Sequence, residues 1–166
     1  INGSGGYYLA KHILENNKNV SVHGIARSRS GYSIQENDIY ERINIVECDM
    51  NDFSSLLNVL KKVKPDCIFH LAAYANVKAS FINPLTVLQN NILSTSNLLE
   101  SLRLLNINPI FQLCSTSEVY GQVKKNEIPI NETNPIRPSS PYAVSKVTQD
   151  LLGYTYYKSY NLNIIR

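Results

Sequence analysis

The stretch Cys67-Ile68-Phe69-His70-Leu71 is a short and almost continuous apolar run, which is typical of a buried strand. A similar run extends from Pro109 to Cys114, and a helical pattern that begins at Asn83-Pro84 lies between the two. The apolar positions of this helix share one stripe, which we expect in the core or in an interface: Leu85, Leu88, Ile92, Leu99 and Leu102. A strand, a helix and a second strand in this order predict a parallel pair joined by a right-handed crossover.

The same alternation continues in both directions from this unit. Further helices are expected at residues 7 to about 15, about 53 to 63, and 141 to about 160. Further strands are expected at residues 20–26, 43–48 and 162–165, with a polar loop at residues 122–140. This order predicts an α/β fold, a Rossmann-like doubly wound parallel sheet with helices on both faces. Its ligand crevice should lie at the carboxyl ends of the strands.

The two ends of the sequence suggest that elements of this fold are missing. Ile1-Asn2-Gly3-Ser4-Gly5-Gly6 has the form of a strand-to-helix turn without its strand, and Arg166 directly follows a strand. We therefore expect residues 1–166 to form one partial cofactor-binding domain, truncated at both ends. The first strand and a carboxyl-terminal substrate domain would be the absent parts.

Composition argues against several other classes of protein. With 43% hydrophobic and 17% charged residues among 166, the chain can bury a core and is not disordered. The net charge of +3 comes from interspersed acids and bases, and no apolar run approaches the roughly 20 residues of a membrane span. We therefore expect neither nucleic acid nor a membrane as a partner. Cys48, Cys67 and Cys114 are expected to be buried small residues in a reducing compartment, the cytoplasm, and no histidine has neighbours at metal-ligand spacing.

Residues that suggest chemistry lie in the second half of the chain. Ser115-Thr116-Ser117-Glu118-Val119-Tyr120-Gly121 supplies hydroxyl groups and a carboxylate, and Ser-Pro-Tyr-Ala-Val-Ser-Lys supplies Tyr142 and Lys146. A Tyr four residues before a Lys on a helix shares its face, where the ammonium lowers the phenol pKa from about 10 and favours a general base. Ser140 and Pro141 predict the N-cap and first residue of that helix. An exposed helical pair without a role would show the same spacing.

A cofactor turn is suggested at the beginning of the chain. Gly3 and Gly6 allow the backbone to approach a pyrophosphate at the N-terminus of the first helix. Tight packing would use the same glycines, so this turn alone leaves the two interpretations even. Arg27 stands after the 20–26 strand, where an NAD site has an acid, which favours a 2′-phosphate and hence NADP over NAD. Arg27 and Arg29 as ordinary surface residues are the alternative.

Two further positions follow strands and have two interpretations each. Asp49 follows the 43–48 strand and would accept a hydrogen bond from an adenine amino group, or would cap the next helix, for which Asp52 is better placed. Ala72 and Ala73 follow the 67–71 strand and are small enough for a cofactor ribose to lie against the backbone. Close packing of small residues explains Ala72 and Ala73 equally well.

Together these residues resemble the extended short-chain dehydrogenase/reductase family of nucleotide-sugar enzymes over essentially the whole chain. The matching segments are Gly3 and Gly6, Asp49, His70-Leu71-Ala72-Ala73, Asn91 with Thr95, Thr116 to Gly121, and the Tyr142/Lys146 pair. The resemblance implies a catalytic set of Thr116, Glu118, Tyr142 and Lys146. It implies a cofactor site made of Gly3, Gly6, Arg27, Asp49, Met50, Leu71, Ala72, Ala73, Tyr142 and Lys146.

Within this family the chain looks most like the GDP-mannose 4,6-dehydratases. The segments that carry this likeness are Thr-Ser-Glu before Val-Tyr-Gly, His-Gly-Ile-x-Arg at 23–27, and Val77-Lys78-x-Ser80-Phe81. The resemblance implies that a nucleotide sugar, GDP-mannose, becomes GDP-4-keto-6-deoxymannose by internal hydride transfer through NADP, in a homodimer or homotetramer. One departure is Arg27-Ser28-Arg29, where these dehydratases have two adjacent arginines. Ser117 distinguishes the chain from the dTDP-glucose 4,6-dehydratases, which have an Asp there.

The motifs leave three other functions open. GDP-4-keto-6-deoxymannose reductases share the residues around Arg137 and Tyr142, and UDP-glucuronate decarboxylases share Thr-Ser-Glu-Val-Tyr-Gly. A plain 4-epimerase would lack the carboxylate at position 118. A regulatory module that binds NADP without catalysis is the non-enzymatic alternative.

Overall fold

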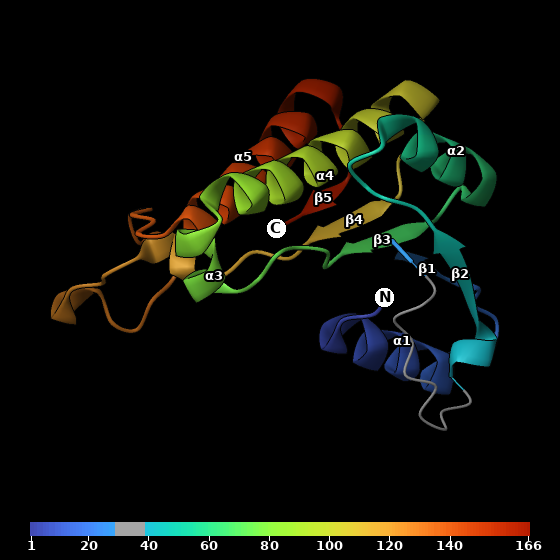
Figure 1. The fold of residues 1–166 in the computed structure, drawn as a ribbon, viewed down its shortest axis with the longest axis horizontal. Coiled ribbons are helices and arrows are strands. Elements are labelled where there is room, and N and C mark those ends of the chain that lie inside the picture. Colours follow the sequence, from blue (N-terminus) through green and yellow to red (C-terminus); the bar gives the residue numbers. More distant parts are fainter. Residues whose placement is uncertain (29–38) are drawn as a thin grey trace.

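The computed structural model describes residues 1–28 and 39–166, and Arg29 lies outside the described residues. Figure 1 shows strands in the middle of the molecule with helices above and below them. In chain order the elements are α1 (Ser4–Asn16), β1 (Val22–Ala26), the 3₁₀ helix η2 (Tyr40–Arg42), β2 (Ile43–Glu47), α2 (Phe53–Val63), β3 (Cys67–His70), α3 (Val77–Ile82), α4 (Pro84–Leu105), β4 (Ile110–Leu113), the 3₁₀ helices η3 (Ser117–Tyr120) and η4 (Lys125–Glu127), α5 (Pro141–Tyr160) and β5 (Ile164–Ile165).

All strand pairs in the described residues are parallel, as the alternation of strands and helices predicts. β1 pairs with β2, and β3, β4 and β5 pair in that order in a second sheet. Ile1 lies beside β1, because its amino group donates to the Ile25 carbonyl at 3.0 Å. A Cβ on Gly24 would lie 2.7 Å from the Ile1 Cβ, so glycine is needed for this close approach. The Rossmann-like α/β fold is confirmed, although the described strands form two hydrogen-bonded sheets.

Helices cover the two sheets unequally. α2, α4 and α5 lie on one side and α1 on the other (Figure 1). The main core forms where α2, α4 and α5 meet the strands, and it includes Leu56, Leu99 and Phe111, each with 0% exposure. On the opposite face of β3–β4–β5, Phe69, Ile110 and Ile165 are 44–53% exposed. Within residues 1–28 and 39–166, α1 packs against β1 and β2 and not against this face of the β3–β4–β5 sheet.

Capping residues set the ends of α2 and α5, the two helices whose limits are predicted best from the sequence. The Asp52 carboxylate accepts from the Ser55 N–H at 3.1 Å at the start of α2, and Ser140 Oγ accepts from the Ala143 N–H at 3.0 Å at the start of α5. Lys64 adopts a left-handed conformation (φ 46°) and ends α2 before Pro65. The cap interpretation of Asp52 and the N-cap at Ser140 are confirmed.

Other sequence predictions need correction. α1 begins at Ser4, not at Tyr7, and the short helix α3, capped by Asn76, was not predicted. On α4, Leu99 and Leu102 are buried, but Leu85 is 79% exposed. The buried face of α4 is partly polar. Asn91 and Thr95 form hydrogen bonds with α5, and Asn97 donates to the carbonyls of Met50 and Asn51. The buried polar residues of α4 are Asn91, Ser94, Thr95, Asn97 and Ser101.

The cysteines divide between core and surface. Cys48 is buried and Cys114 is half-buried, but Cys67 is exposed because it points to the uncovered face of β3. The prediction of burial is therefore wrong for Cys67. All three thiols are free.

Candidate active site

The carboxyl end of β4 and the first turns of α5 bring the predicted catalytic residues together. Lys146 lies one turn after Tyr142 on α5, and both side chains are buried. Lys146 Nζ donates to the Cys114 carbonyl at 2.5 Å, which joins α5 to the residue that directly follows β4. Because Thr116 and Glu118 come next in the chain and η3 packs against α5, the hydroxyl, carboxylate, phenol and ammonium share one region.

Thr116 shapes the turn that carries Glu118. Its Oγ1 accepts from the Glu118 N–H at 3.3 Å and caps η3. The Glu118 carboxylate forms no hydrogen bond or ion pair with the described residues, so the structure gives it no role as a cap. The phenol of Tyr142 likewise has no hydrogen-bond partner among them, and both groups are available for a ligand.

Gly121 closes this turn against the long loop that precedes α5. Its φ of 58° lies in the left-handed region, and a Cβ there would come within 1.9 Å of the Arg137 carbonyl oxygen. The Arg137 N–H donates to the Val119 carbonyl at 2.9 Å, and its guanidinium forms an ion pair with Glu127. These contacts hold residues 122–140 beside the predicted catalytic turn.

A buried polar network lies beneath the site, between β3, α4 and α5. His70 Nε2 lies 2.8 Å from Thr95 Oγ1, which also accepts from Gln149 Nε2 at 2.6 Å. Asn91 Nδ2 donates to Ser145 Oγ at 2.9 Å, and Ser145 Oγ donates to the Tyr142 carbonyl at 2.7 Å. The turn of α5 that carries Tyr142 and Lys146 is thereby fastened to α4.

Burial governs the ionisation of the two basic groups beside this network. Burial, and then the positive charge of Lys146, lowers the pKa of His70 to about 4, so its ring is neutral at neutral pH. Burial also lowers the pKa of Lys146, while Cys114 and Asp150 act in the opposite direction. His70 therefore adds no second cation to the region around Lys146.

The N-terminus of α1 has the features of an anion site. Gly3 is its N-cap. Among the described residues, no side chain caps the helix, and no atom outside the neighbouring residues lies within 4 Å of the position where a Gly3 Cβ would stand. A Cβ on Gly5 would lie 3.9 Å from Leu71, so this helix end is next to the residues that follow β3. A Cβ added at Gly6 would lie 3.0 Å from the Ile1 carbonyl oxygen. Gly3 thus leaves open space, whereas Gly6 allows close packing.

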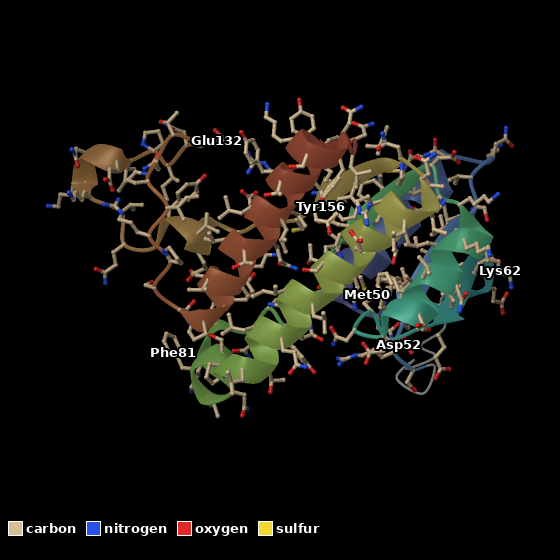
Figure 2. The ribbon with its side chains drawn as sticks, turned by 90° about the horizontal axis from the view of Figure 1, so that it is seen from above. Met50, Asp52, Lys62, Phe81, Glu132 and Tyr156 are labelled. Carbon is tan, nitrogen blue, oxygen red and sulfur yellow. The ribbon has the colours of Figure 1, made fainter. Side chains whose placement is uncertain are left out.

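The other predicted cofactor residues lie along the same edge, because parallel strands end on one side. Arg27 follows β1, while Leu71, Ala72 and Ala73 follow β3, and Leu71 and Ala72 are exposed. The Asp49 carboxylate accepts from the Asn51 N–H at 2.9 Å, so it shapes its own turn. Met50 packs against the main core between α2 and α4, and its carbonyl accepts from Asn97 (Figure 2). Its side chain is therefore part of the core packing.

Two residues of this edge were not recognised from the sequence in the roles that the structure gives them. Tyr74 Oη accepts from Arg27 Nη1 at 3.2 Å, and the Asn91 side chain bonds both the N–H and the carbonyl of Tyr74. The residue pattern flagged Asn91 but not its contact with Tyr74. No spacing rule connects residues 27, 74 and 91, so this contact could be found only in the folded chain.

Two kinds of feature are absent from the described parts of the chain. No helix there combines the length and apolar character that crossing a membrane requires. Over the same residues, no three His, Cys, Asp or Glu side chains gather as metal ligands.

Comparison with known proteins places this geometry in a family. A family profile described as GDP-mannose 4,6 dehydratase matches residues 1–166. The GDP-mannose 4,6-dehydratase of Vibrio cholerae is 36% identical over 172 residues, covering 98% of this chain and 45% of the relative. This chain spans about half the length of the curated relatives it matches.

Solved structures show the same architecture. The UDP-glucose 4-epimerase of Thermus thermophilus in complex with NAD has a TM-score of 0.82 and 27% identity, over 96% of this chain and 49% of that one. RMD from Pseudomonas aeruginosa complexed with NADPH has a TM-score of 0.69 and 25% identity, over 93% and 46%. Since the profile covers the whole chain, the chain belongs to the GDP-mannose 4,6 dehydratase family of extended short-chain dehydrogenases/reductases.

Proposed function

We propose that the whole protein is a nucleotide-sugar 4,6-dehydratase that converts GDP-mannose to GDP-4-keto-6-deoxymannose with NADP. Residues 1–166 act in this proposal as its cofactor-binding domain. The observation that carries it is the bond from Lys146 Nζ to the Cys114 carbonyl, because it ties the Tyr142 helix to the turn with Thr116 and Glu118. The family match and the dehydratase relatives support the choice of reaction.

The crevice fits a dinucleotide cofactor. The uncapped N-terminus of α1 with open space at Gly3 suits a pyrophosphate, and Arg27 supplies a cation for a 2′-phosphate. When bound, the nicotinamide would supply hydride chemistry, because it can take the hydride from carbon 4 of the sugar and give it back at carbon 6. Relatives of known structure bind NAD or NADPH, and Arg27 is the reason to prefer NADP here.

Different side chains of this protein carry out the proton transfers of the proposed reaction. Tyr142 takes the proton of the sugar 4-hydroxyl, and Thr116 hydrogen-bonds the same oxygen. The Lys146 ammonium favours the ionised phenol. Once carbon 4 is a ketone, the proton on carbon 5 is acidic, and Glu118 removes it and then protonates the departing 6-hydroxyl as water. After carbon 6 has received the hydride, carbon 5 regains a proton and Tyr142 releases the one it took, which completes the 4-keto-6-deoxy sugar. Two proton transfers of different character need two groups, which explains a carboxylate beside the Tyr/Lys pair.

The test compares wild-type protein with Glu118→Gln, in the whole protein, supplied with GDP-mannose and a catalytic amount of NADP⁺. We expect the variant to lose formation of the 4-keto-6-deoxy sugar by at least about a hundredfold, the usual contribution of a general acid–base group. Its NADP⁺ affinity should be unchanged. Glu132→Gln is the matched control, because Glu132 is exposed on the 122–140 loop (Figure 2). Normal product from Glu118→Gln would refute the role given to this carboxylate.

The same assay separates the competing functions. A 4-epimerase, the activity of the Thermus thermophilus neighbour, would leave Glu118 without a role and would give a sugar with an inverted carbon 4 and no loss of water. A reductase would require a keto sugar and stoichiometric NADPH. An NADP-binding protein inert with all of these substrates would support a regulatory module.

Association of two copies through α4 and α5 is part of the proposal. Pro84 to Leu99 of α4 contains no charged residue, and Lys146, the one charged residue between Pro141 and Gln149 on α5, is buried. Leu85, Leu93, Val144 and Leu151 are 37–79% exposed on these helices. An uncharged, partly apolar surface of this kind suits a homodimer or a homotetramer. The three free thiols fit a reducing compartment such as the cytoplasm.

A further inference from the structure

Arg27 and Tyr74 form a contact between the residue that follows β1 and the segment that follows β3. The guanidinium carbon of Arg27 lies 5.3 Å from the centre of the Tyr74 ring, and Nη1 donates to the Tyr74 hydroxyl at 3.2 Å. The two residues are 47 positions apart in the chain. A guanidinium over an aromatic face is attracted by the ring, and the hydrogen bond fixes its rotation. Arg27 is thus held in one orientation although it is exposed.

Tyr74 is itself anchored to a buried residue. Asn91 Oδ1 accepts from the Tyr74 N–H at 2.7 Å, and Asn91 Nδ2 lies within bonding distance of the Tyr74 carbonyl at 3.3 Å. Asn91 has 0% exposure and also bonds Ser145 on α5. The backbone that carries the Tyr74 ring is therefore fixed to α4 and, through Asn91, to α5.

The charge of Arg27 is not neutralised within the described residues. Arg27 forms no ion pair there, and the more distant carboxylate of Asp49 contributes only a weak attraction. One guanidinium N–H is used by Tyr74, and the remaining donors are free to bind the oxygens of a phosphate. An exposed, oriented and unneutralised guanidinium is suited to a dianion.

We propose that Tyr74 is a specificity-determining residue, which orients Arg27 and so sets the preference for a cofactor with a phosphate on the adenosine ribose. This inference rests on the proposed function, because it takes the crevice to hold a nicotinamide dinucleotide. Tyr74 acts through Arg27 and is a positioning residue. NAD⁺ lacks the phosphate, so its binding should not depend on the orientation of Arg27.

The test measures the dissociation constants of NADP⁺ and NAD⁺ by calorimetry for the whole wild-type protein, Tyr74→Phe and Tyr74→Leu. Loss of an exposed cation–π contact predicts that Tyr74→Leu weakens NADP⁺ binding about twofold to fivefold. Tyr74→Phe keeps the ring and should fall between wild type and Tyr74→Leu. NAD⁺ binding should change by less than about 1.5-fold in both variants, which is smaller than the loss expected for NADP⁺ with Tyr74→Leu.

A matched control exists at the far ends of α4 and α5. Arg103 lies over Tyr160 at the same distance, 5.3 Å, so Tyr160→Leu removes an equivalent contact away from the crevice. It should change neither constant. Equal weakening of NADP⁺ and NAD⁺ by Tyr74→Leu, or none, would overturn the inference while leaving the proposed function intact. A folded wild-type protein that binds neither cofactor would overturn both.

Discussion

A single side chain, His70, shows how burial controls ionisation beside the site. Its exposure is 3%, and burial followed by the Lys146 charge lowers its pKa from 6.5 to about 4. In the unfolded chain, His70 is therefore protonated below about pH 6.5. In the folded chain it is protonated only below about pH 4. Stability contributed by the neutral ring is fully present above pH 6.5 and is lost as the pH falls through this window.

This linkage predicts that the free energy of unfolding falls by roughly 3 kcal/mol between pH 6.5 and 4 on account of His70 alone. Urea denaturation of the chain at a series of pH values measures it. His70→Gln keeps an amide near Thr95 but cannot titrate, so its stability should decline less steeply over the same range. Carboxylates titrate in both proteins, so the difference between the two curves isolates His70. Identical slopes would contradict the prediction.

At the scale of single elements, the turn between η3 and the 122–140 loop depends on one glycine. Gly121 has a φ of 58°, and an added Cβ would collide with the Arg137 carbonyl oxygen at 1.9 Å. Gly121→Ala should therefore destabilise the chain by about 2 kcal/mol or more, as a lowered thermal midpoint would show. Gly5→Ala is the control, because its Cβ would make only an ordinary contact with Leu71 at 3.9 Å within α1. A midpoint for Gly121→Ala equal to that of Gly5→Ala would show that the turn adjusts.

Elements with strong local signals were predicted well from the sequence. α2 and α5 begin and end where their caps place them, because Asp52 and Ser140 act on backbone groups three residues away. α3 has only six residues and no apolar period, so its signal, the cap at Asn76, was too weak to notice. Leu85 was misplaced because the buried face of α4 is centred on Val87, Asn91 and Leu98, and the polar Asn91 hides this face from an apolar pattern.

The candidate site also combines features that depend on local spacing in the sequence with contacts between residues far apart in the chain. Tyr142 and Lys146 share a face of α5 because of their spacing, which the sequence displays. The bond from Lys146 to Cys114 spans 32 positions and that from Arg27 to Tyr74 spans 47, and both require the folded sheet. The candidate residues could therefore be named from the sequence, but their supports could not.

At the scale of the whole molecule, the outer face of α4 and α5 carries the last prediction. Leu151 is 50% exposed on α5, in line with Val144 seven residues before it. If two copies pack through this face, Leu151→Glu places a charge in an apolar contact. We expect it to raise the dissociation constant of the dimer at least tenfold, about 1.4 kcal/mol, without lowering the stability of the monomer.

Sedimentation of the whole protein over a range of concentrations measures this shift. Ile136→Glu is the matched control, since Ile136 is also 50% exposed but lies on the 122–140 loop, outside both helices. It adds the same charge in place of a similar apolar side chain, so it should leave the association unchanged. If both variants dissociate alike, net charge and not this helix pair governs assembly. If the wild-type protein is monomeric throughout, the α4–α5 face has no second copy as its partner.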